Sequence, residues 1–451
     1  MSDLASLVRP TARAHAHRLA PPRKDYRDAA RELEAALKPR LSGEVRFDTG
    51  SRAAYATDHS IYRAVPVGVV IPRNADDVIA TVEACRTREV PILARGCGSS
   101  LSGQSTNVAV VIDFSKYMNR ILALDPQSGM AKVEPGVIND TLRNKAKAHG
   151  MTFAPDPATH QWCTLGGNIG NNSCGAHTVM GGKTVDNVLE LDILTYDGLR
   201  MTVGETPDPE YELIVKAGGR RCEIYRGLKG IAERYGDAIR RNYPRIPRRV
   251  SGYNLDDLLP ENNFHVARSL VGSESTCALV LNATVRLIPF PACRALMVLG
   301  YEDAPRAADD APAIRALHPL AIEGFDQHLI LNESRKGKTF AGQPLLPEGE
   351  AWLLVEFGGD SQREANSKVE AAYQTLKRGG SGALEMRLVE EQERQAALWE
   401  MREDGVGASR VPGFEEAWPS WEDAAVPPEK LGSYLRGLDK LNKEFGYTYT
   451  L

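Results

Sequence analysis

The sequence predicts an α+β protein made of two units that meet near residue 290. From Val67 onward, short apolar strands alternate with single amphipathic helices, which indicates a helix-covered sheet with parallel pairing within it. Pro289 and Pro291 then stop an apolar strand, and a new series of strands and helices begins after them. Residues 166–182 contain six glycines. Each glycine inside a helix costs about 1 kcal/mol relative to alanine, so this stretch is expected to be non-helical.

The elements of the first unit follow from hydrophobic periodicity and from turn residues. A helix that begins near Asp25 is expected to end before Pro39, and Gly150 is expected to close a later one. Gly198 ends the turn that begins at Tyr196. The expected helices cover residues 29–37, 75–88 and 138–149, and the expected strands cover 67–71, 90–94, 108–112, 131–134, 188–195 and 278–288.

The second unit repeats the alternation of strands and helices. Its expected strands cover residues 296–301 and 352–357, its expected helices cover 307–317, 364–377 and 428–445, and a loop rich in Gly and Pro covers 336–350. A last strand is expected to begin at Gly446 and to be cut off at Leu451. The chain is therefore divided into an N-terminal arm and helix (1–62), a first domain (63–290) and a second domain (291–451) that is expected to be incomplete.

Composition and charge exclude several classes of function. The 451 residues include 55 Lys and Arg against 59 Asp and Glu, a net charge of −4, which disfavours nucleic acid or an anionic membrane surface as a partner. No apolar run reaches the length of about 18 residues that a membrane span needs. Seven scattered cysteines without a C-x-x-C pair favour free thiols in the cytoplasm over a disulfide, zinc or iron–sulfur site. The basic stretch 5–24 is expected to be a disordered arm, with a transit peptide as the alternative.

The loop from Arg95 to Gln104 follows a predicted buried strand and consists mostly of small polar residues. Such a loop lets consecutive backbone N–H groups converge on an anion, and Arg95 adds positive charge. A Rossmann fingerprint would need glycine where Leu101 stands, and a Walker A loop would need lysine where Gln104 stands. A dinucleotide pyrophosphate therefore fits the loop better than a nucleoside triphosphate, and a plain surface turn is the remaining alternative.

This loop resembles the pyrophosphate loop of PCMH-type FAD-binding proteins, the vanillyl-alcohol oxidase superfamily. Segments similar to later motifs of that family follow in family order between about residues 66 and 290, at 133–137, 155–159, 165–175, 182–186, 196–198 and 270–276. Residues 251–255 and 421–427 resemble the branch that contains D-lactate and D-2-hydroxyglutarate dehydrogenases. Within that branch, the chain is most similar to bacterial proteins that fuse this flavin half to an iron–sulfur half.

The resemblance implies a two-subdomain PCMH-type FAD-binding fold followed by a ferredoxin-like α/β substrate cap that is truncated at the C-terminus. It also implies an FAD-linked dehydrogenase that oxidises a D-2-hydroxy acid, of the lactate or 2-hydroxyglutarate class, by hydride transfer to flavin N5. Noncovalent FAD is expected, with a thioether to Cys97 as the disfavoured alternative. The implied cofactor-binding residues are Arg95, Gly96, Cys97, Gly98, Ser99, Ser100, Ser102, Gly103, Gln104, Pro155, Asp156, Gly166, Gly167, Asn168, Asn171, Asn172, Ser173, Gly175, Ala176, Asp186, Gly272 and Glu274.

For the substrate, Arg402 matches the family position whose guanidinium holds the substrate carboxylate, since a planar fork suits a carboxylate. The alternative for Arg402 is an ion pair with Glu403 or Asp404 on an exposed helix. His177 is expected either to face the flavin or to cap a turn, with the cap favoured. His59 is expected to be structural.

No catalytic residue and no metal ligand can be assigned, because the histidine-rich metal segment and the iron–sulfur cysteines of the resembling dehydrogenases would lie beyond residue 451. Oxidation of a hydroxy acid needs a base or a metal to accept the hydroxyl proton, so slow turnover is expected. The alternative function is a flavin-binding module that has no turnover and needs a partner chain to complete its site. An iron–sulfur protein or other electron acceptor and a second copy of the chain are the further partners considered.

Overall fold

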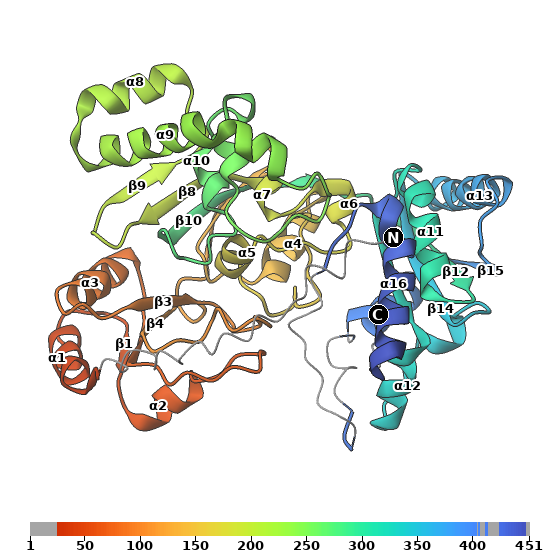
Figure 1. The fold of residues 1–451 in the computed structure, drawn as a ribbon, viewed down its shortest axis with the longest axis horizontal. Coiled ribbons are helices and arrows are strands. Elements are labelled where there is room, and N and C mark those ends of the chain that lie inside the picture. The colour runs from red at the N-terminus through yellow and green to blue at the C-terminus, as the bar shows by residue number, and fades with distance from the viewer. Residues whose placement is uncertain (1–24, 404, 406–410, 414–423, 448–451) are drawn as a thin grey trace, which may run out of the picture.

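The computed structural model describes residues 25–403, 405, 411–413 and 424–447. Three predictions therefore fall wholly or partly outside the described residues: the basic arm 5–24, the motif 421–427 and the strand expected at 446–451. Figure 1 shows two sheets with their helices on one side of the molecule and a third sheet with its helices on the other.

The first sheet has four strands in the order β1-β2-β4-β3. Strand β4 pairs in parallel with both β2 and β3, and only β1 is antiparallel, so the predicted parallel pairing is confirmed for this sheet. The apolar faces of α1 and α3 meet the sheet in one buried cluster that includes Leu37, Val70 and Cys85. The elements of this subdomain are α1 (Arg27–Leu37), β1 (Glu44–Arg46), α2 (Thr49–Ala54), β2 (Gly68–Ile71), α3 (Ala75–Arg86), β3 (Ile92–Arg95) and β4 (Val110–Asp113).

The second sheet has five strands in the order β5-β6-β10-β8-β9, and all of its pairs are antiparallel. The prediction of parallel pairing is therefore wrong for this sheet. Tight turns are the reason: Gly129 (φ +66°) lies in the turn from β5 to β6 and Gly198 (φ +94°) in the turn from β8 to β9, and a hairpin forces its strands antiparallel. The elements of this subdomain are β5 (Ile121–Asp125), β6 (Met130–Val133), α4 (Asn139–Lys147), β7 (Met151–Thr152), α5 (Leu165–Asn171), α6 (Thr178–Gly181), α7 (Thr184–Asn187), β8 (Val188–Leu194), β9 (Arg200–Val203), α8 (Asp208–Ala217), α9 (Gly219–Asn242), the 3-10 helices Leu255–Leu258 and Pro260–Asn262, α10 (Val266–Leu270), β10 (Leu279–Arg286) and β11 (Ile288–Pro289).

The glycine-rich stretch contains a helix, α5, which the expectation of non-helical backbone excluded. Thr164 caps this helix, because its Oγ1 accepts a hydrogen bond from the Gly167 N–H (3.2 Å). Gly166 packs directly on Pro135, where a Cβ would lie 2.7 Å from the Pro135 Cβ. The cap and this close contact, which requires glycine, offset the low helix propensity of the sequence. The expectation is therefore wrong for residues 166–171, and also for residues 178–181, which form α6.

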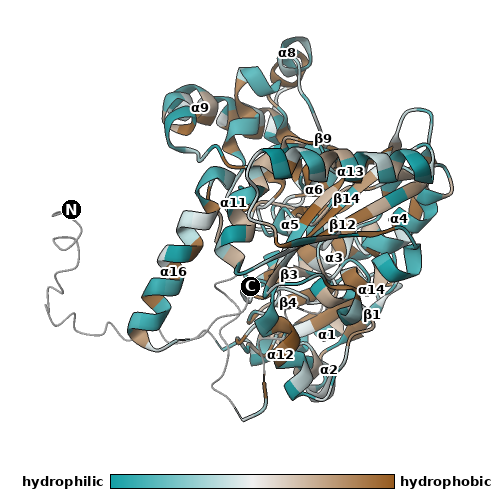
Figure 2. Cartoon of the chain, turned by 90° about the vertical axis from the view of Figure 1, so that its right-hand side faces the viewer, coloured by the Kyte–Doolittle hydropathy of each residue, from teal (hydrophilic) through white to brown (hydrophobic). Residues whose placement is uncertain are grey.

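The third sheet has four antiparallel strands in the order β13-β14-β12-β15. Its segments β12-α11-β13 and β14-α13-β15 are two strand–helix–strand units, which together give the predicted ferredoxin-like cap. Figure 2 shows the polar outer face of α13 above the apolar strands β12 and β14. The elements of the cap are β12 (Cys293–Tyr301), α11 (Ala304–Arg315), β13 (Ala321–Asp326), α12 (Gln327–Arg335), the 3-10 helix Gln343–Leu345, β14 (Ala351–Gly359), α13 (Gln362–Arg378), β15 (Glu385–Val389), α14 (Gln392–Glu403), the 3-10 helix Pro428–Lys430 and α16 (Leu431–Phe445).

The two faces of the cap sheet have different neighbours. One face packs under α11 and α13 through residues such as Met297 and Val355. Leu354 lies on the other face, which packs against Leu398 of α14. Side chains alternate along a strand, so Glu356 lies on the same face as Leu354. Glu356 is 3% exposed, and a carboxylate buried this deeply needs cationic partners.

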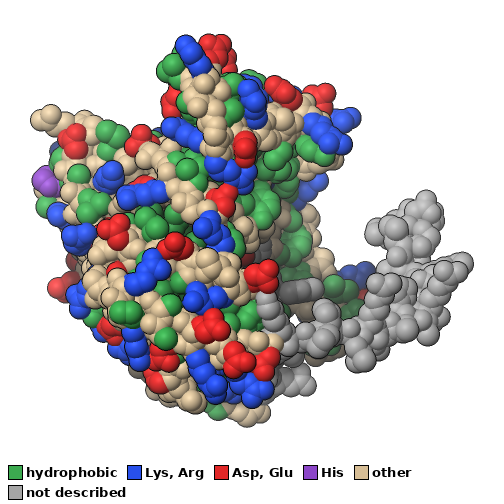
Figure 3. Space-filling model, turned by 90° about the vertical axis from the view of Figure 1, so that its left-hand side faces the viewer, with side chains coloured by type: hydrophobic (Ala, Val, Ile, Leu, Met, Phe, Trp, Pro, Cys, Tyr) green, Lys and Arg blue, Asp and Glu red, His purple; other side chains and the backbone are tan. Residues whose placement is uncertain are grey.

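Over the described ranges of the chain, we find no helix whose length and apolar character would let it cross a membrane. Figure 3 shows one face of the two subdomains that contain the first and second sheets (residues 25–290), which we call the FAD-side subdomains. Basic and acidic side chains are interspersed on this face, and neither sign gathers into a patch. This mixed surface agrees with the small net charge of −4.

Candidate functional site

The predicted anion-binding loop follows β3 and has no regular secondary structure over residues 96–109. Gly98 (φ +75°) and Gly103 (φ +85°) both take positive φ values, which glycine adopts without strain. Arg95 donates from Nη1 to the Ser105 carbonyl (2.8 Å) and from Nη2 to the Thr57 carbonyl (2.9 Å). The guanidinium therefore holds the loop in shape from within.

Segments that are far apart in the sequence meet at this loop. Gln104 Nε2 lies 3.4 Å from Asn171 Oδ1, at the end of α5. The backbone N–H groups of Gly272 and Glu274 donate to carbonyls of α5, at 2.8 and 3.0 Å. The structure thus brings together the loop 95–104, the helix of the glycine-rich run and the element near residue 272, all of which were predicted to bind the cofactor.

A buried donor at the end of α5 fits a flavin dinucleotide. Asn172 ends α5 with φ +56°, and its Oδ1 accepts a hydrogen bond from the Val185 N–H (3.0 Å), which fixes the orientation of the amide. Its Nδ2 is buried and has no hydrogen-bond partner among the residues that the structure describes. A buried donor without an acceptor costs about 1–3 kcal/mol, and the carbonyl oxygens of an isoalloxazine ring are acceptors of the kind that is missing. The loop and the end of α5 are therefore the groups that would hold FAD.

Other predicted cofactor-binding residues lie close to this surface or support it, and their contacts with FAD stay predictions. Cys97 is exposed, with its Sγ 3.3 Å from Ser99 Oγ. The carbonyl of Pro155 accepts a hydrogen bond from Asn139 Nδ2 (2.9 Å). The Asp186 carboxylate accepts from the Lys183 N–H (2.8 Å) at the start of α7, so this side chain already acts as a helix cap.

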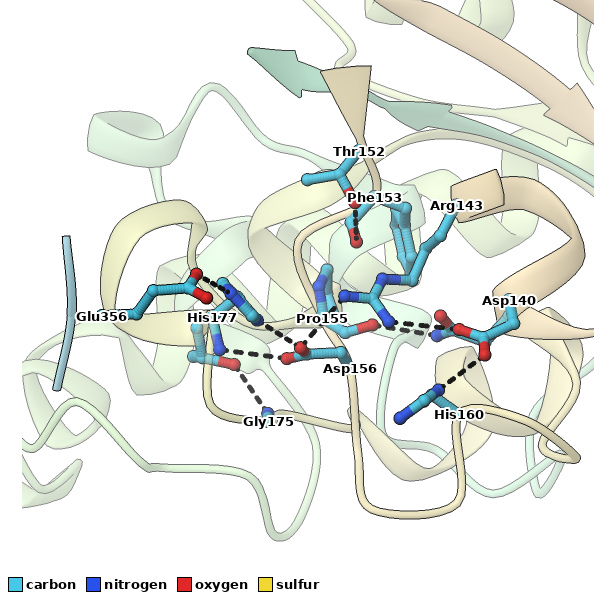
Figure 4. A network of polar contacts seen from close by, with 12 residues as sticks. Asp140, Arg143, Thr152, Phe153, Pro155, Asp156, His160, Gly175, His177 and Glu356 are labelled. Carbon is cyan, nitrogen blue, oxygen red and sulfur yellow. Dashed lines mark hydrogen bonds and ion pairs between the residues drawn. The ribbon is translucent and has the colours of Figure 1, made fainter. Parts of the chain in front are cut away.

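A buried histidine joins the FAD-side subdomains to the cap (Figure 4). His177 precedes α6, and its Nδ1 forms an ion-paired hydrogen bond with Asp156. On the other side of the ring, Nε2 lies 3.0 Å from Glu356 Oε2 on β14. The ring also packs edge-on against Phe290, with centroids 5.3 Å apart. Although His177 occupies the N-cap position of α6, its ring forms no capping bond, so the favoured expectation of a turn cap is wrong for the side chain.

The two carboxylates decide the protonation state of His177. Burial alone would lower the pKa of His177, but Asp156 and Glu356 raise that pKa to about 10. Asp156 also accepts a hydrogen bond from Arg143 Nη2 (3.2 Å). Burial would raise the pKa of Asp156, yet His177 and Arg143 hold it below its ordinary value. His177 is therefore an imidazolium ion at neutral pH and cannot serve as a base.

A second histidine, which the sequence analysis did not single out, makes a similar bridge. His160 Nδ1 lies 2.8 Å from Asp140 Oδ2 on α4, and its Nε2 lies 3.0 Å from Glu403 Oε1 on α14 of the cap. Burial lowers the pKa of His160, but Asp140 and Glu403 raise it to about 9. Arg143 connects the two bridges, because its Nη1 also donates to Asp140 (3.1 Å). His160 and Glu403 are 243 residues apart in the sequence, so no local sequence motif could predict their contact.

A cleft of about 2210 Å³ lies between the FAD-side subdomains and the cap. Its walls include α4 and residues 174–177 on one side, and β13, α12, α14 and α16 on the other. Arg402 lines this cleft, as a substrate-binding residue should. Its Nε donates to Glu323 Oε2 on β13 (2.8 Å), a partner that the sequence did not indicate, whereas Asp404 lies outside the described residues. Within the described ranges, no group of three or more His, Cys, Asp or Glu side chains is arranged to hold a metal ion.

Two protein-family models match this chain. The model described as "FAD binding domain" matches residues 66–204, and the model described as "FAD linked oxidases, C-terminal domain" matches residues 290–451. The first match contains the loop after β3 and the glycine-rich run, and the second contains the cap. The second match therefore begins where the cap begins, close to the predicted boundary near residue 290.

Several curated proteins are similar to the chain over most of its length. A D-2-hydroxyglutarate dehydrogenase of Pseudomonas putida is 33% identical over 429 residues, which are 92% of this chain and 42% of that protein. A D-2-hydroxyglutarate dehydrogenase of Escherichia coli is 29% identical over 91% of this chain and 42% of that protein. The glycolate oxidase subunit GlcD of Bacillus subtilis is 27% identical over 90% of this chain and 75% of that protein. The chain thus spans less than half the length of these dehydrogenases.

Solved structures show the same fold. An alkyldihydroxyacetonephosphate synthase superposes with a TM-score of 0.57 at 17% identity, over 86% of this chain and 65% of that chain. A carbohydrate oxidase of Microdochium nivale superposes with a TM-score of 0.52 at 12% identity, over 82% of this chain and 63% of that chain. At such low identity the similarity concerns the fold alone.

Proposed function

Because this chain belongs to the PCMH-type family of FAD-linked oxidases, we propose that it is an FAD-dependent oxidoreductase that oxidises a D-2-hydroxy acid of the lactate or 2-hydroxyglutarate class. The observation that carries the proposal is the cleft between the cap and the FAD-side subdomains, which has an arginine on the cap wall and the end of the glycine-rich run on the other. We assign residues 63–290 to FAD binding and residues 291–451 to the substrate cap.

FAD supplies the hydride acceptor, flavin N5, when it is bound. The backbone N–H groups of the loop 96–104 would hold its pyrophosphate, because the positive φ values at Gly98 and Gly103 turn the chain tightly there. Asn172 Nδ2 would donate to the ring system, since this buried amide lacks an acceptor within the described part of the chain.

The cleft suits an anionic substrate. The Lys and Arg side chains that line the cleft equal the Asp and Glu side chains in number. The protonated rings of His160 and His177 therefore give the lining a net positive charge. We propose that the Arg402 guanidinium binds the substrate carboxylate through its terminal nitrogens while Glu323 fixes Nε. The hydroxyl proton needs an acceptor, and neither histidine can be that base, because both nitrogens of each ring face carboxylates.

We propose a cytoplasmic location and an electron-accepting partner protein. All seven cysteines are free thiols, which suits a reducing compartment. The relative from Bacillus subtilis is named as a subunit of an oxidase, which supports a partner chain here.

Anaerobic mixing tests the proposed activity. The purified chain is loaded with FAD, and its visible spectrum is followed after addition of D-lactate, D-2-hydroxyglutarate and, as the control, L-lactate. We expect loss of the visible flavin absorbance with a D-acid only. A flavin spectrum that stays unchanged by every acid, together with no binding of any of them, would overturn the proposal.

A further inference from the structure

We propose that His160 and His177 are positioning residues that fix the cap over the FAD-side subdomains, and with it the placement of Arg402, by each joining a carboxylate of one domain to a carboxylate of the other. The bridges are Asp140–His160–Glu403 and Asp156–His177–Glu356. The inference deepens the proposed function and rests on it where it concerns substrate binding.

The bridges form one continuous series of alternating charges, of which Figure 4 shows the part from His160 through Asp140, Arg143, Asp156 and His177 to Glu356. Arg143 lies in the middle and contacts both Asp140 (3.1 Å) and Asp156 (3.2 Å), so the FAD-side halves of the two bridges are linked. At the cap end, Glu356 also accepts a hydrogen bond from Arg294 Nε (3.3 Å). Every member therefore has an oppositely charged neighbour, which is the condition under which buried charges are tolerated.

Each bridge requires the doubly protonated ring. A neutral imidazole has one N–H donor and one acceptor nitrogen, and an acceptor nitrogen that faces a carboxylate is repelled by it. His160 has an ion-pair contact with Asp140 at 2.8 Å from Nδ1 and a hydrogen bond with Glu403 at 3.0 Å from Nε2, one from each domain. Loss of one proton would therefore release one of the two domains. The charged groups that face the rings are Asp140, Asp156, Glu356 and Glu403. The raised pKa values of His160 (about 9) and His177 (about 10) agree with this geometry.

The bridge through His160 ends beside the substrate-binding residue. Glu403 and Arg402 are consecutive residues in the last turn of α14, and Leu398 and Met401 bury the same helix against the cap sheet. His160 follows the segment 155–159, which was predicted to contact the flavin. The His160–Glu403 bridge thus joins the helix that presents Arg402 to the side of the molecule that holds FAD.

The test compares Glu403→Gln with Glu393→Gln in the FAD-loaded full chain. Both changes remove one negative charge from α14 and keep the side-chain shape, but Glu393 is an exposed first-turn residue that contacts neither histidine. Three quantities are measured: the pKa of His160 by NMR of ¹³C-labelled histidine, assigned with His160→Gln; amide hydrogen exchange of residues 392–403; and the Kd of D-2-hydroxyglutarate from the flavin spectrum.

For Glu403→Gln we expect a fall of at least one unit in the pKa of His160, at least tenfold faster amide exchange in α14 and at least tenfold weaker binding of D-2-hydroxyglutarate, with FAD affinity unchanged. Glu393→Gln should match the unmodified chain in all of these. Unchanged exchange and an unchanged His160 pKa would overturn the bridge, and a lost bridge with unchanged acid affinity would overturn the positioning of Arg402. If even the unmodified chain does not bind the acid, the proposed function fails, while titration and exchange still decide whether the bridge holds α14.

Discussion

Replacement of Gly98 by valine should weaken FAD binding, because the loop after β3 depends on the backbone of this residue. Gly98 has φ +75°, a conformation that costs an L-residue about 1–2 kcal/mol. A Cβ at this position would lie 2.4 Å from Arg95 Nη2, so the guanidinium would have to move. Loss of one of its two hydrogen bonds to carbonyls would cost about 1.5–3 kcal/mol more. The loop would be destabilised by roughly 2.5–5 kcal/mol in all.

The free loop of the variant relaxes, and FAD binding must restore the strained shape. At about 1.4 kcal/mol per tenfold, the Kd of FAD should rise between about 60-fold and several thousand-fold. Quenching of FAD fluorescence on titration with the apoprotein measures this Kd. Gly218→Val is the matched control, because Gly218 has φ +69° and no atom lies within 4 Å of an added Cβ. If Gly98→Val binds FAD as tightly as Gly218→Val does, the loop does not hold the cofactor and the reasoning fails.

Three further predictions concern substrate affinity, packing and pH. Arg402→Lys keeps the charge but loses the planar fork, so the Kd of D-2-hydroxyglutarate should rise by roughly tenfold in a flavin-absorbance titration, and equal affinities would refute the role. Gly175→Ala places a Cβ 2.0 Å from the Asp156 carbonyl oxygen, so it should lower the free energy of unfolding by about 1–3 kcal/mol. Urea unfolding measures this change, and an unchanged urea midpoint would count against that contact. The pKa values of His160 and His177 are raised in the folded state. Their contribution to the free energy of unfolding is therefore complete below the ordinary histidine pKa of about 6.5, and it disappears as the pH rises to about 9 for His160 and about 10 for His177. The free energy of unfolding should therefore fall over this window, and His160→Gln should reduce the slope by up to about 1.4 kcal/mol per pH unit, an effect whose absence would contradict the bridge.

Much of the fold could be predicted because it rests on local patterns. The helix that begins near Asp25, the parallel strands of the first sheet and the cap helices α11, α13 and α16 follow from apolar periodicity and from proline or glycine near their ends. The cap helices α12 and α14 were not predicted. Helix α5 could not be predicted, because the contact of Gly166 with Pro135 that favours it is made by residues 31 positions apart. The antiparallel second sheet departs from the prediction for a different reason: the turns at Gly129 and Gly198 join neighbouring strands directly, without the helix that a parallel connection needs.

The candidate site likewise contains a local segment that the sequence predicted and a long-range contact that it could not predict. The loop from Arg95 to Gln104 is one continuous segment, so its composition alone predicted an anion-binding surface, and its contact with FAD stays a prediction. The role of His177 could not be predicted, because Glu356 approaches it from a strand 179 residues away. The only signal in the sequence was a carboxylate in an otherwise apolar strand, β14, where a buried Glu356 requires a cation.

The histidine bridges also limit how freely the cap can be exchanged between related proteins. A recombinant that joins this FAD-binding half to the cap of a distant relative would leave the imidazolium groups of His160 and His177 without their cap-side carboxylates unless that cap supplied acidic residues at the places of Glu403 and Glu356. Hydrophobic contacts across the interface tolerate such exchanges, because apolar side chains of similar volume substitute for one another. The cap is thus a compatible module only for halves that carry the matching pattern of charge.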